Sequence, residues 1–365
     1  MLYKNIKILE KWRINLKIKI GLLNLFIITI LKEKDMWEIN LKELEELQPM
    51  IDRLYEKKAI LDKNRPFPSF IIEKIKENLS FEWTYNSNAI EGNTITLRET
   101  QLILQEGITI KGKSLREHFE TFNHNKAIDY LYSLVKPDYV FREIDILNLH
   151  GVVLNNIEEH FAGRIRTGGV RINGANFIPP NANKVPDLFD ELVKFVNENP
   201  LHLNDILLAT IFHHKFLWIH PFFDGNGRTV RLAMNLILMK AGFPPAIILK
   251  TDRKKYYEAL NQANNGSYYK LCLLMIQAIE RTLNIYISSL PGSYTEYDSI
   301  NNIVNEEQSP YGKEYISLLA RQGKIDAYKE GKNWYTSKEA IENYMNSRKR
   351  IRKVNKDSSQ PTSKK

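Results

Sequence analysis

The sequence predicts a mainly α-helical protein with one β-hairpin in its helical body and a small separate module near its C-terminus. Three observations lead to this prediction. Apolar residues recur at helical spacing through most of residues 36–290. The hairpin-turn signal Asn173-Gly174 lies between two short runs of β character. Beyond the linker signal Pro291-Gly292-Ser293, the pattern changes to helix, strand, turn and strand.

The helical body starts with an amphipathic segment from Met36 to Lys63, in which leucine and isoleucine residues share one face. Pro49 lies inside this segment and is expected to kink or split it, and Pro66 and Pro68 end it. A second helix is expected from Ser69 to about Asn86. The other helices of the body are expected at 98–106, 115–134, 142–158, 186–198, 203–218, 227–241, 252–263 and 266–290.

The hairpin is expected to pair Gly169–Ile172 with Asn176–Ile178. The C-terminal module, residues 294–346, is expected to contain a helix at 311–321 and two strands, Lys324–Lys329 and Asn333–Thr336. Ser337 would then cap a last helix that ends near Met345. Residues 347–365 are rich in Lys, Arg and Ser and are predicted to be disordered.

The positive charge is concentrated near the two ends of the sequence. Of the formal net charge of +9, residues 1–35 contribute +5 and residues 347–365 contribute +7, so the chain between them carries −3. This distribution is more typical of an enzyme with basic tails than of a DNA-binding body. The single cysteine, Cys272, excludes a disulfide framework and a cysteine-based zinc site and favours a reducing compartment, the cytoplasm.

Residues 1–35 contain an apolar run, Ile20–Leu31, with lysines on both sides. Its 12 residues are fewer than the ~20 that span a bilayer, and no small-residue cleavage signal follows it. We interpret residues 1–35 as a dispensable extension or as an artefact of gene calling with Met36 as the true start. An interfacial amphipathic segment is the alternative, and no membrane partner is expected.

The segment 219–232 holds the densest cluster of reactive side chains in the chain. Gly225-Asn226-Gly227 can turn successive backbone N–H groups toward an anion. It leads into a predicted helix, whose N-terminal end favours negative charge. Arg228 and Arg231 are three residues apart on that helix, so they share a face and can hold neighbouring phosphates.

Two further groups add chemistry to this segment. The Asp224 carboxylate precedes the glycine-rich turn, where it is placed to hold Mg²⁺ against phosphate oxygens. His220 lies four residues before Asp224, on a short proline-stiffened loop, and can exchange a proton near pH 7. The sequence therefore predicts a site that binds a polyphosphate with magnesium and deprotonates a nucleophile. It has no Gly-x-x-x-x-Gly-Lys-[Ser/Thr] motif, which excludes a P-loop nucleotide site.

This segment resembles the Fic family signature, His-Pro-Phe-x-x-Gly-Asn-Gly-Arg-x-x-Arg. It matches at all eight defined positions, which are His220, Pro221, Phe222, Gly225, Asn226, Gly227, Arg228 and Arg231. The resemblance covers roughly residues 36–290. It implies a Fic-type helical bundle with an N-terminal helical region at 36–110 and a catalytic domain at 111–290. It also implies ATP and Mg²⁺ as cofactors, and transfer of AMP to a Ser, Thr or Tyr hydroxyl of a target protein or of the chain itself.

The resemblance also assigns roles to individual residues. His220 would be the general base, Asp224 would hold Mg²⁺, and Asn264 would hydrogen-bond the adenine, on which Tyr256 or Tyr257 stacks. The phosphates would lie against Gly225, Asn226, Gly227, Arg228, Thr229 and Arg231. The predicted hairpin resembles the flap of the family and would bring Gly174, Ala175, Asn176 and Phe177 near the nucleotide. His213 and His214 are interpreted as packing residues or supports of the site rather than metal ligands.

Ser87-Asn88-Ala89-Ile90-Glu91-Gly92 is similar to the inhibitory pattern of the family, [Ser/Thr]-x-x-x-Glu-[Gly/Asn]. This similarity assigns Ser87, Glu91 and Gly92 to an inhibitory motif. It implies that Glu91 pairs with Arg231 and takes the place of the γ-phosphate, so that the protein restrains itself in cis.

Residues 294–346 resemble the winged helix-turn-helix of excisionase-like proteins, with Lys324, Lys329 and Lys332 on or beside the wing. This resemblance implies either contact with DNA through residues 294–365 or docking of a protein. Three functions stay open: AMP transfer restrained by Glu91, removal of AMP from modified proteins by the same site, and a DNA-binding regulator with a self-modifying Fic body. The sequence identifies neither the target protein nor the oligomeric state, and a homodimer is allowed.

Overall fold

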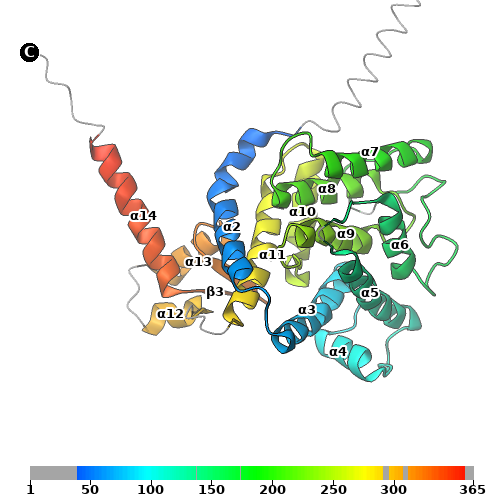
Figure 1. Ribbon diagram of the computed structural model, residues 1–365, viewed down its shortest axis with the longest axis horizontal. Helices are drawn as coiled ribbons and strands as arrows, with labels where there is room; N and C mark the ends of the chain where they lie inside the picture. Colours follow the sequence, from blue (N-terminus) through cyan, green and yellow to red (C-terminus); the bar gives the residue numbers. More distant parts are fainter. Residues whose placement is uncertain (1–38, 137, 173, 291–295, 307–310, 358–365) are drawn as a thin grey trace, which may run out of the picture. The chain divides into compact units, whose positions relative to one another are not determined.

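Helices make up most of the described chain, as the apolar spacing predicts (Figure 1). The computed structural model describes residues 39–136, 138–172, 174–290, 296–306 and 311–357. Residues 1–38, which include the predicted N-terminal extension and Met36, lie outside the described residues. From Glu43 onward the chain forms one unit by its contacts.

The elements of the body follow one another as a series of helices. They are η2 (Leu41–Leu47), α2 (Gln48–Lys63), α3 (Ser69–Ile90), α4 (Leu97–Glu106), α5 (Leu115–Leu134), α6 (Glu143–Val153), η3 (Ala182–Lys184), α7 (Val185–Glu198), α8 (Asp205–Ile219), α9 (Asn226–Lys240), η4 (Lys250–Asp252), α10 (Arg253–Asn264) and α11 (Tyr269–Ser288). The C-terminal part contains β1 (Asp298–Ser299), α12 (Ile300–Glu306), α13 (Lys313–Arg321), β2 (Ala327–Glu330), β3 (Asn333–Thr336) and α14 (Lys338–Asp357).

Local sequence signals explain where several of these helices begin. Pro49 splits the first predicted helix, because a 3₁₀ segment ends at Leu47 and Pro49 lies in the first turn of α2. Thr96 caps α4, where its hydroxyl accepts from the Glu99 N–H and the Glu99 carboxylate accepts from the Thr96 N–H. Ser114 and Glu117 form the same reciprocal capping pair at α5.

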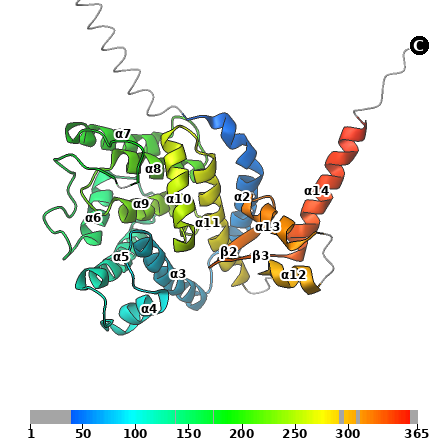
Figure 2. The same cartoon turned by 180° about the vertical axis from the view of Figure 1, so that it is seen from behind.

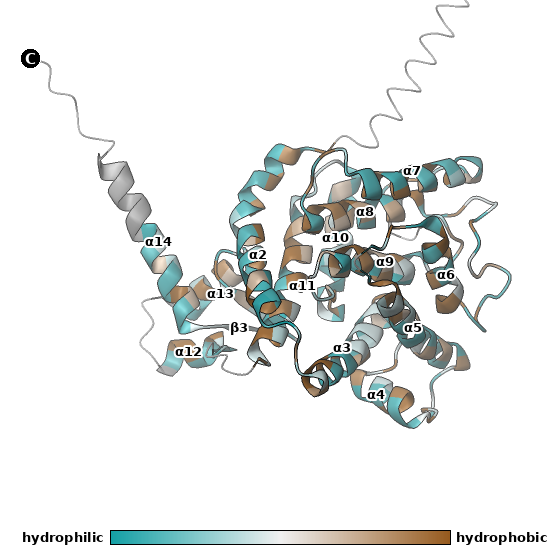
Figure 3. Cartoon of the chain, viewed as in Figure 1, coloured by the Kyte–Doolittle hydropathy of each residue, from teal (hydrophilic) through white to brown (hydrophobic). Residues whose placement is uncertain are grey.

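The core is organised around α8, which packs against α7, α9, α10 and α11. Most side chains of α8 are buried around its whole circumference, including Leu208, Ile211, Phe212 and Phe216. The neighbouring α7 is amphipathic instead, and hydrophilic residues dominate its visible face (Figure 3). By length and composition alone α11 could cross a membrane, but much of it is buried and it packs against α2, α8 and α10.

The mostly helical fold is confirmed, but the β-hairpin predicted within the body is wrong. Residues 169–172 and 174–180 contain no strand, and Asn173 lies outside the described residues. Here the Ala175 N–H donates to the Ile172 carbonyl as in a turn (3.3 Å). The loop is held by side chains from elsewhere: Asn261 donates to the Gly174 carbonyl and Arg166 to the Gly168 and Pro180 carbonyls. These contacts hold the turn and both ends of the segment, while residues 169–172 and 176–178 form no strand.

The C-terminal module has a core of its own and an antiparallel sheet in the order β1-β3-β2. Asp298 and Ala327 both pair with Thr336, from opposite sides of β3. The two predicted strands correspond to β2 and β3, whereas β1 and α12 were not predicted. Both segments are short, and the helical spacing of Ile300, Ile303 and Val304 in α12 extends over little more than one turn.

The prediction that residues 347–365 are disordered is wrong up to Asp357, because α14 continues to that residue. Lys and Arg favour helices, so a basic segment can prolong a helix that has already started. Residues 358–365 lie outside the described residues.

Buried ion pairs join this module to the body. Glu280 of α11, with 1% of its surface exposed, accepts from Arg53 (2.6 and 2.8 Å) and from Lys57 (2.9 Å), both of α2. Lys57 also donates to Asp326, which precedes β2, at 2.5 Å, and the Tyr297 hydroxyl donates to the same carboxylate at 2.9 Å. Two cations and two anions therefore balance across α2, α11 and the module.

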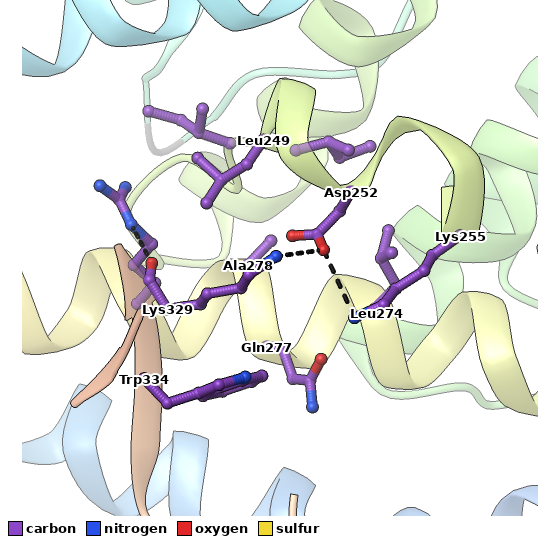
Figure 4. A pocket seen from close by; sticks show the side chains of 11 residues that line it. Leu249, Asp252, Lys255, Leu274, Gln277, Ala278, Lys329 and Trp334 are labelled. Carbon is purple, nitrogen blue, oxygen red and sulfur yellow. Dashed lines mark hydrogen bonds and ion pairs between the residues drawn. The ribbon is translucent and has the colours of Figure 1, made fainter. Parts of the chain in front are cut away.

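The hairpin of β2 and β3 lies along α11, as the view from behind shows (Figure 2). Its Lys329 ammonium group donates to Asp252 of η4 at 2.6 Å, and its Lys329 carbonyl accepts from Arg281 of α11 at 2.9 Å. In the close view, Lys329 extends to Asp252 above α11 while Trp334 lies near Gln277 (Figure 4). The predicted wing is thus packed against the body.

We expect Glu280→Gln to lower the free energy of unfolding by ~3–5 kcal/mol, because it leaves the Arg53 and Lys57 charges short of an anion in a buried place. Urea denaturation measures this loss, provided that the unfolding free energy depends equally steeply on urea concentration in the variant and the wild type. The control is Asp62→Asn, at an exposed pair with Lys58, where the expected loss is under ~1 kcal/mol. Equal losses in the two variants would contradict the importance of the buried network.

Candidate active site

A cavity of about 120 Å³ brings together residues from the end of α3, the loop after Arg171, and helices α8, α9 and α10. Predicted site residues line much of it, namely Glu91, Gly174, Ala175, Phe177, His220, Gly227, Arg231, Tyr256, Tyr257 and Asn264. Ile172, His214, Leu217, Leu260 and Asn261 line it too and were not predicted as lining residues.

Part of this lining had a signal in the sequence. Tyr257, Leu260, Asn261 and Asn264 are spaced three or four residues apart, so they share one face of α10. The same spacing relates His214 and Leu217 on α8. Because both faces point into the cavity, a helical projection from Asn264 would have found these neighbours.

The His220 loop is held by one buried arginine that sequence reasoning missed. Arg166, with 1% of its surface exposed, donates to the carbonyls of His220 (2.7 Å) and Ile219 (3.3 Å). It also donates to the carbonyls of Gly168 (2.8 Å) and Pro180 (2.6 Å). His220 itself takes a left-handed backbone conformation with φ of 51°. Arg166 therefore fixes an unfavourable turn and the loop before it in one arrangement.

Burial lowers the pKa of His220 to about 4, although the Leu217 carbonyl and the Glu91 and Asp224 carboxylates partly offset this effect. The imidazole is therefore neutral at neutral pH. A neutral imidazole that lines the cavity can accept a proton from a hydroxyl group bound there.

The start of α9 lies directly after this loop. Gly225 has a positive φ of 75° and precedes the first helical residue, Asn226. The Asn226 side chain accepts from the Phe222 N–H (3.0 Å) and donates to the Phe222 carbonyl (2.8 Å), so its amide braces the loop. The first N–H groups of α9 have no acceptor within the helix, which leaves this end suited to an anion. Thr229, one turn further on, is fully buried.

Asp224 lies at the edge of this turn between two arginines. Its carboxylate accepts from Arg116 (2.7 Å) and lies 3.5 Å from Arg228, which in turn pairs with Glu120. Burial raises the pKa of Asp224, but Arg228, the Gly225 N–H and Arg116 outweigh it and hold the pKa below its usual value. The carboxylate is thus ionised, and a metal cation there would have to share it with Arg116 and Arg228.

Mg²⁺ suits this place only in part. Among the described residues, no group of three or more His, Cys, Asp or Glu side chains is arranged to hold a metal ion. Mg²⁺ commonly binds through one or two carboxylates together with phosphate oxygens and waters. Asp224 can supply one such carboxylate, and a bound polyphosphate would have to supply further oxygens.

His150 of α6 supports the Asp224 turn and was also missed. Its Nε2 donates to the Asp224 carbonyl (3.0 Å) and its Nδ1 accepts from the Gly163 N–H (2.9 Å). Its ring stacks on Phe222 at 3.7 Å between centroids. Burial lowers the pKa of His150 to about 4, so the neutral form that these two contacts need is the stable one.

Arg231 lines the cavity and contacts three acceptor groups, which belong to Ser87 of α3 and to Glu91 at its end. Its Nε donates to the Ser87 hydroxyl (3.0 Å), and its Nη2 donates to the Ser87 carbonyl (2.8 Å) and pairs with Glu91 (2.8 Å). Glu91 caps the C-terminus of α3, and Gly92 leaves the helix with φ of 106°. Gly227 permits the approach, since a Cβ there would lie 2.1 Å from the Glu91 Oε1.

The two tyrosines that line the cavity beside Arg231 differ. Tyr256 is buried, and its hydroxyl bonds to the His213 Nε2 at 3.0 Å. Tyr257 is partly exposed and lies under the Arg253 guanidinium. Asn264 donates to Asn176 of the 169–180 loop at 3.2 Å, which brings Asn176 to the rim. Tyr257 is therefore the ring that a planar ligand can reach.

A second pocket lies between η4, α11 and the β2–β3 hairpin (Figure 4). It contains no residue of the 219–232 segment, and its Asp252 and Lys329 already pair with each other. We therefore assign the phosphate binding and proton transfer predicted for the 219–232 segment to the cavity beside His220. That cavity combines a neutral base, a helix start, a buried guanidinium and an end with amides and an aromatic ring, which suits a nucleoside polyphosphate.

Comparisons with known proteins agree with this assignment. Residues 140–238 match the model of the Fic/DOC family. "Protein adenylyltransferase Fic" of Nematostella vectensis is 37% identical over 246 residues, which cover 66% of this chain and 56% of the relative. "Protein adenylyltransferase fic-1" of Caenorhabditis elegans is 36% identical over 245 residues, with 66% and 47% covered. The chain thus spans about half the length of these curated relatives.

Two solved structures have the same fold. The structure of "Fic-1 (aa134 - 508) from C. elegans" superposes with a TM-score of 0.61 and 33% identity, covering 66% of this chain and 72% of that one. A Fic domain containing signaling protein from Bacteroides thetaiotaomicron has a TM-score of 0.61 and 25% identity, with 66% and 96% covered.

We expect Arg166→Lys to destabilise the fold by ~2–4 kcal/mol, because a single ammonium group cannot satisfy four separated carbonyls. Affinity for nucleotides should fall with it, as the His220 loop loses its support. Urea denaturation and calorimetric titration with ATP measure the two effects. Arg164→Lys, two residues earlier and exposed, is the control. If both variants behave like the wild type, Arg166 does not hold the loop.

Proposed function

We propose that this chain, which belongs to the Fic/DOC family, transfers AMP from ATP to a hydroxyl side chain of a target protein. We also propose that Glu91 restrains this transfer. The observation that carries this proposal is the cavity in which neutral His220, the start of α9 with Arg231, and Asn264 meet. The curated relatives described above, which are named protein adenylyltransferases, support the same reaction.

The geometry suggests how the reaction proceeds. A Ser, Thr or Tyr hydroxyl reaches His220, whose imidazole takes the proton as the oxygen attacks the α-phosphorus of ATP. The bond between the α-phosphorus and the bridging oxygen breaks, and pyrophosphate leaves. The N–H groups at the start of α9 and the Arg231 guanidinium stabilise the charge on the phosphates. Mg²⁺ held by Asp224 would supply further neutralisation of that charge.

Glu91 competes with the terminal phosphate for the same cation. Its carboxylate lies 2.8 Å from Arg231 and above Gly227, where the phosphates are expected. With 35% of its side chain exposed, Glu91 can leave, whereas buried Ser87 keeps two contacts with Arg231. Removal of Glu91 should therefore free the phosphate site without displacing Arg231.

We expect Glu91→Gly to raise AMP transfer at least ~10-fold, because the Arg231 charge then becomes available to ATP. Incubation with ATP labelled at the α-phosphate and with Mg²⁺ measures label on protein. Glu91→Gly/His220→Ala is the matched control and should carry no label, since the base is absent.

The alternative is that the site removes AMP from modified proteins, with the partly exposed Glu91 positioning a water molecule in the cavity. Under this alternative, Glu91→Gly abolishes release of AMP from a modified substrate and does not increase transfer. The same set of variants therefore separates the two reactions.

Contact with DNA through residues 294–365, a homodimer and a cytoplasmic location stay predictions. Among the three lysines assigned to the wing, Lys329 pairs with Asp252, whereas Lys324 and Lys332 are exposed. A DNA contact would therefore have to use the exposed lysines or release Lys329.

A further inference from the structure

A series of side-chain hydrogen bonds runs from the core to the lining of the cavity. The Tyr268 hydroxyl bonds to the His214 Nδ1 at 2.8 Å, and the His214 Nε2 bonds to the Asn264 Oδ1 at 2.8 Å. The Asn264 Nδ2 then donates to the Asn176 Oδ1 at 3.2 Å. Tyr268 lies outside the lining of the cavity, whereas His214 and Asn264 form part of it.

The direction of these hydrogen bonds follows from the charge state of His214. With 2% of its surface exposed, His214 has a pKa that burial, and next the Lys215 charge, lower to about 3, so the ring is neutral. A neutral imidazole has one donor and one acceptor. Because the Asn264 Oδ1 can only accept, Nε2 carries the hydrogen, and Nδ1 must accept from Tyr268. The Asn264 amide is thereby held with its oxygen toward His214.

We propose that His214 is a positioning residue that orients the Asn264 amide and so makes the cavity prefer adenine to guanine. After its contacts with His214 and Asn176, Asn264 keeps one N–H and one lone pair for a ligand. An acceptor beside a donor complements the N6 amino group and N7 of adenine, whereas guanine offers two acceptors there. An amide without His214 could turn its NH₂ group toward guanine.

This inference rests on the proposed function only in taking the ligand to be a nucleotide. The test uses ADP and GDP, which lack the terminal phosphate that Glu91 is expected to exclude. Calorimetric titration of the full chain gives the ratio of their dissociation constants. We expect a preference for ADP of ~10-fold or more in the wild type, falling to less than ~3-fold in His214→Phe.

Two further variants sharpen this test. Tyr268→Phe removes only the hydroxyl that bonds to the His214 Nδ1 and holds the ring in place, so it should reduce the preference and keeps the test valid if His214→Phe fails to fold. His213→Phe changes the adjacent buried histidine, which contacts Tyr256 instead, and should leave the ratio unchanged.

An equal loss of affinity for both nucleotides in His214→Phe and Tyr268→Phe would overturn the inference and leave AMP transfer as proposed. A wild type that binds neither nucleotide would overturn both.

An independent set of contacts carries a second inference, about the β2–β3 hairpin. Arg281 of α11 holds the Glu82 carboxylate of α3 with both Nη atoms (3.1 and 2.6 Å) and the Lys329 carbonyl of β2 with Nε (2.9 Å). The Lys329 ammonium group pairs with Asp252 of η4 at 2.6 Å (Figure 4). The hairpin thus touches both α11 and η4.

The segment around η4 in turn holds the end of α3 that carries Glu91. The Lys250 N–H donates to the Asn86 side chain at 2.8 Å, and Arg253 donates to the Ile90 carbonyl at 2.7 Å. Arg281 grips the same helix two turns earlier, at Glu82. From this arrangement, we propose that the β2–β3 hairpin restrains α3 and so keeps Glu91 against Arg231.

The restraint, which also rests on the proposed function, is tested by removing the link at Lys329. Lys329→Ala should raise AMP transfer by about 3- to 10-fold, because one partly buried ion pair no longer favours the inhibited arrangement. Asp252→Asn should act in the same direction. Lys332→Ala, at an exposed lysine of the same hairpin, is the control and should have no effect.

The decisive measurement repeats Lys329→Ala in the Glu91→Gly background, where no further rise is expected. A rise of equal size there, or none in the wild-type background, would overturn the restraint while AMP transfer stands. Absence of transfer even in Glu91→Gly would instead overturn the proposed function.

Discussion

The Arg231 guanidinium is buried, with 3% of its surface exposed, and keeps its charge at every physiological pH. An unpaired charge in such a place is costly, so the surrounding chain has to supply acceptors at all times. Ser87 supplies two, and Glu91 supplies the negative charge. These contacts join α9 to the end of α3, and the lack of a side chain at Gly227 leaves room for Glu91.

The sequence predicted those parts of the site that are local. His220, Gly225, Arg228 and Arg231 lie within 12 residues of one another, and their types already indicate phosphate binding and proton transfer. The same is true of most helices, whose apolar spacing and capping residues act over a few turns. Even the boundaries of α5 agree with the prediction.

What the sequence did not reveal depends on contacts between distant segments. Arg166 is one arginine among many until the fold places four carbonyls around it. His150 and His214 are likewise ordinary buried histidines whose roles arise from partners on other elements. The expected hairpin at 169–180 depends on distant contacts as well, because the side chains of Arg166 and Asn261 hold the end and the turn of this segment. The turn residues of a segment do not reveal which side chains from other segments will bind its carbonyl groups.

The network of Arg53, Lys57, Glu280 and Asp326 bears on the boundary that composition places near Pro291. Removal of everything beyond that point would take away Asp326 and leave buried Lys57 and partly buried Arg53 facing one carboxylate. The imbalance would lie between α2 and α11, inside the body itself. The two parts that look modular in the sequence therefore belong to one cooperative unit, in which the last residues help to set the stability of the first helices.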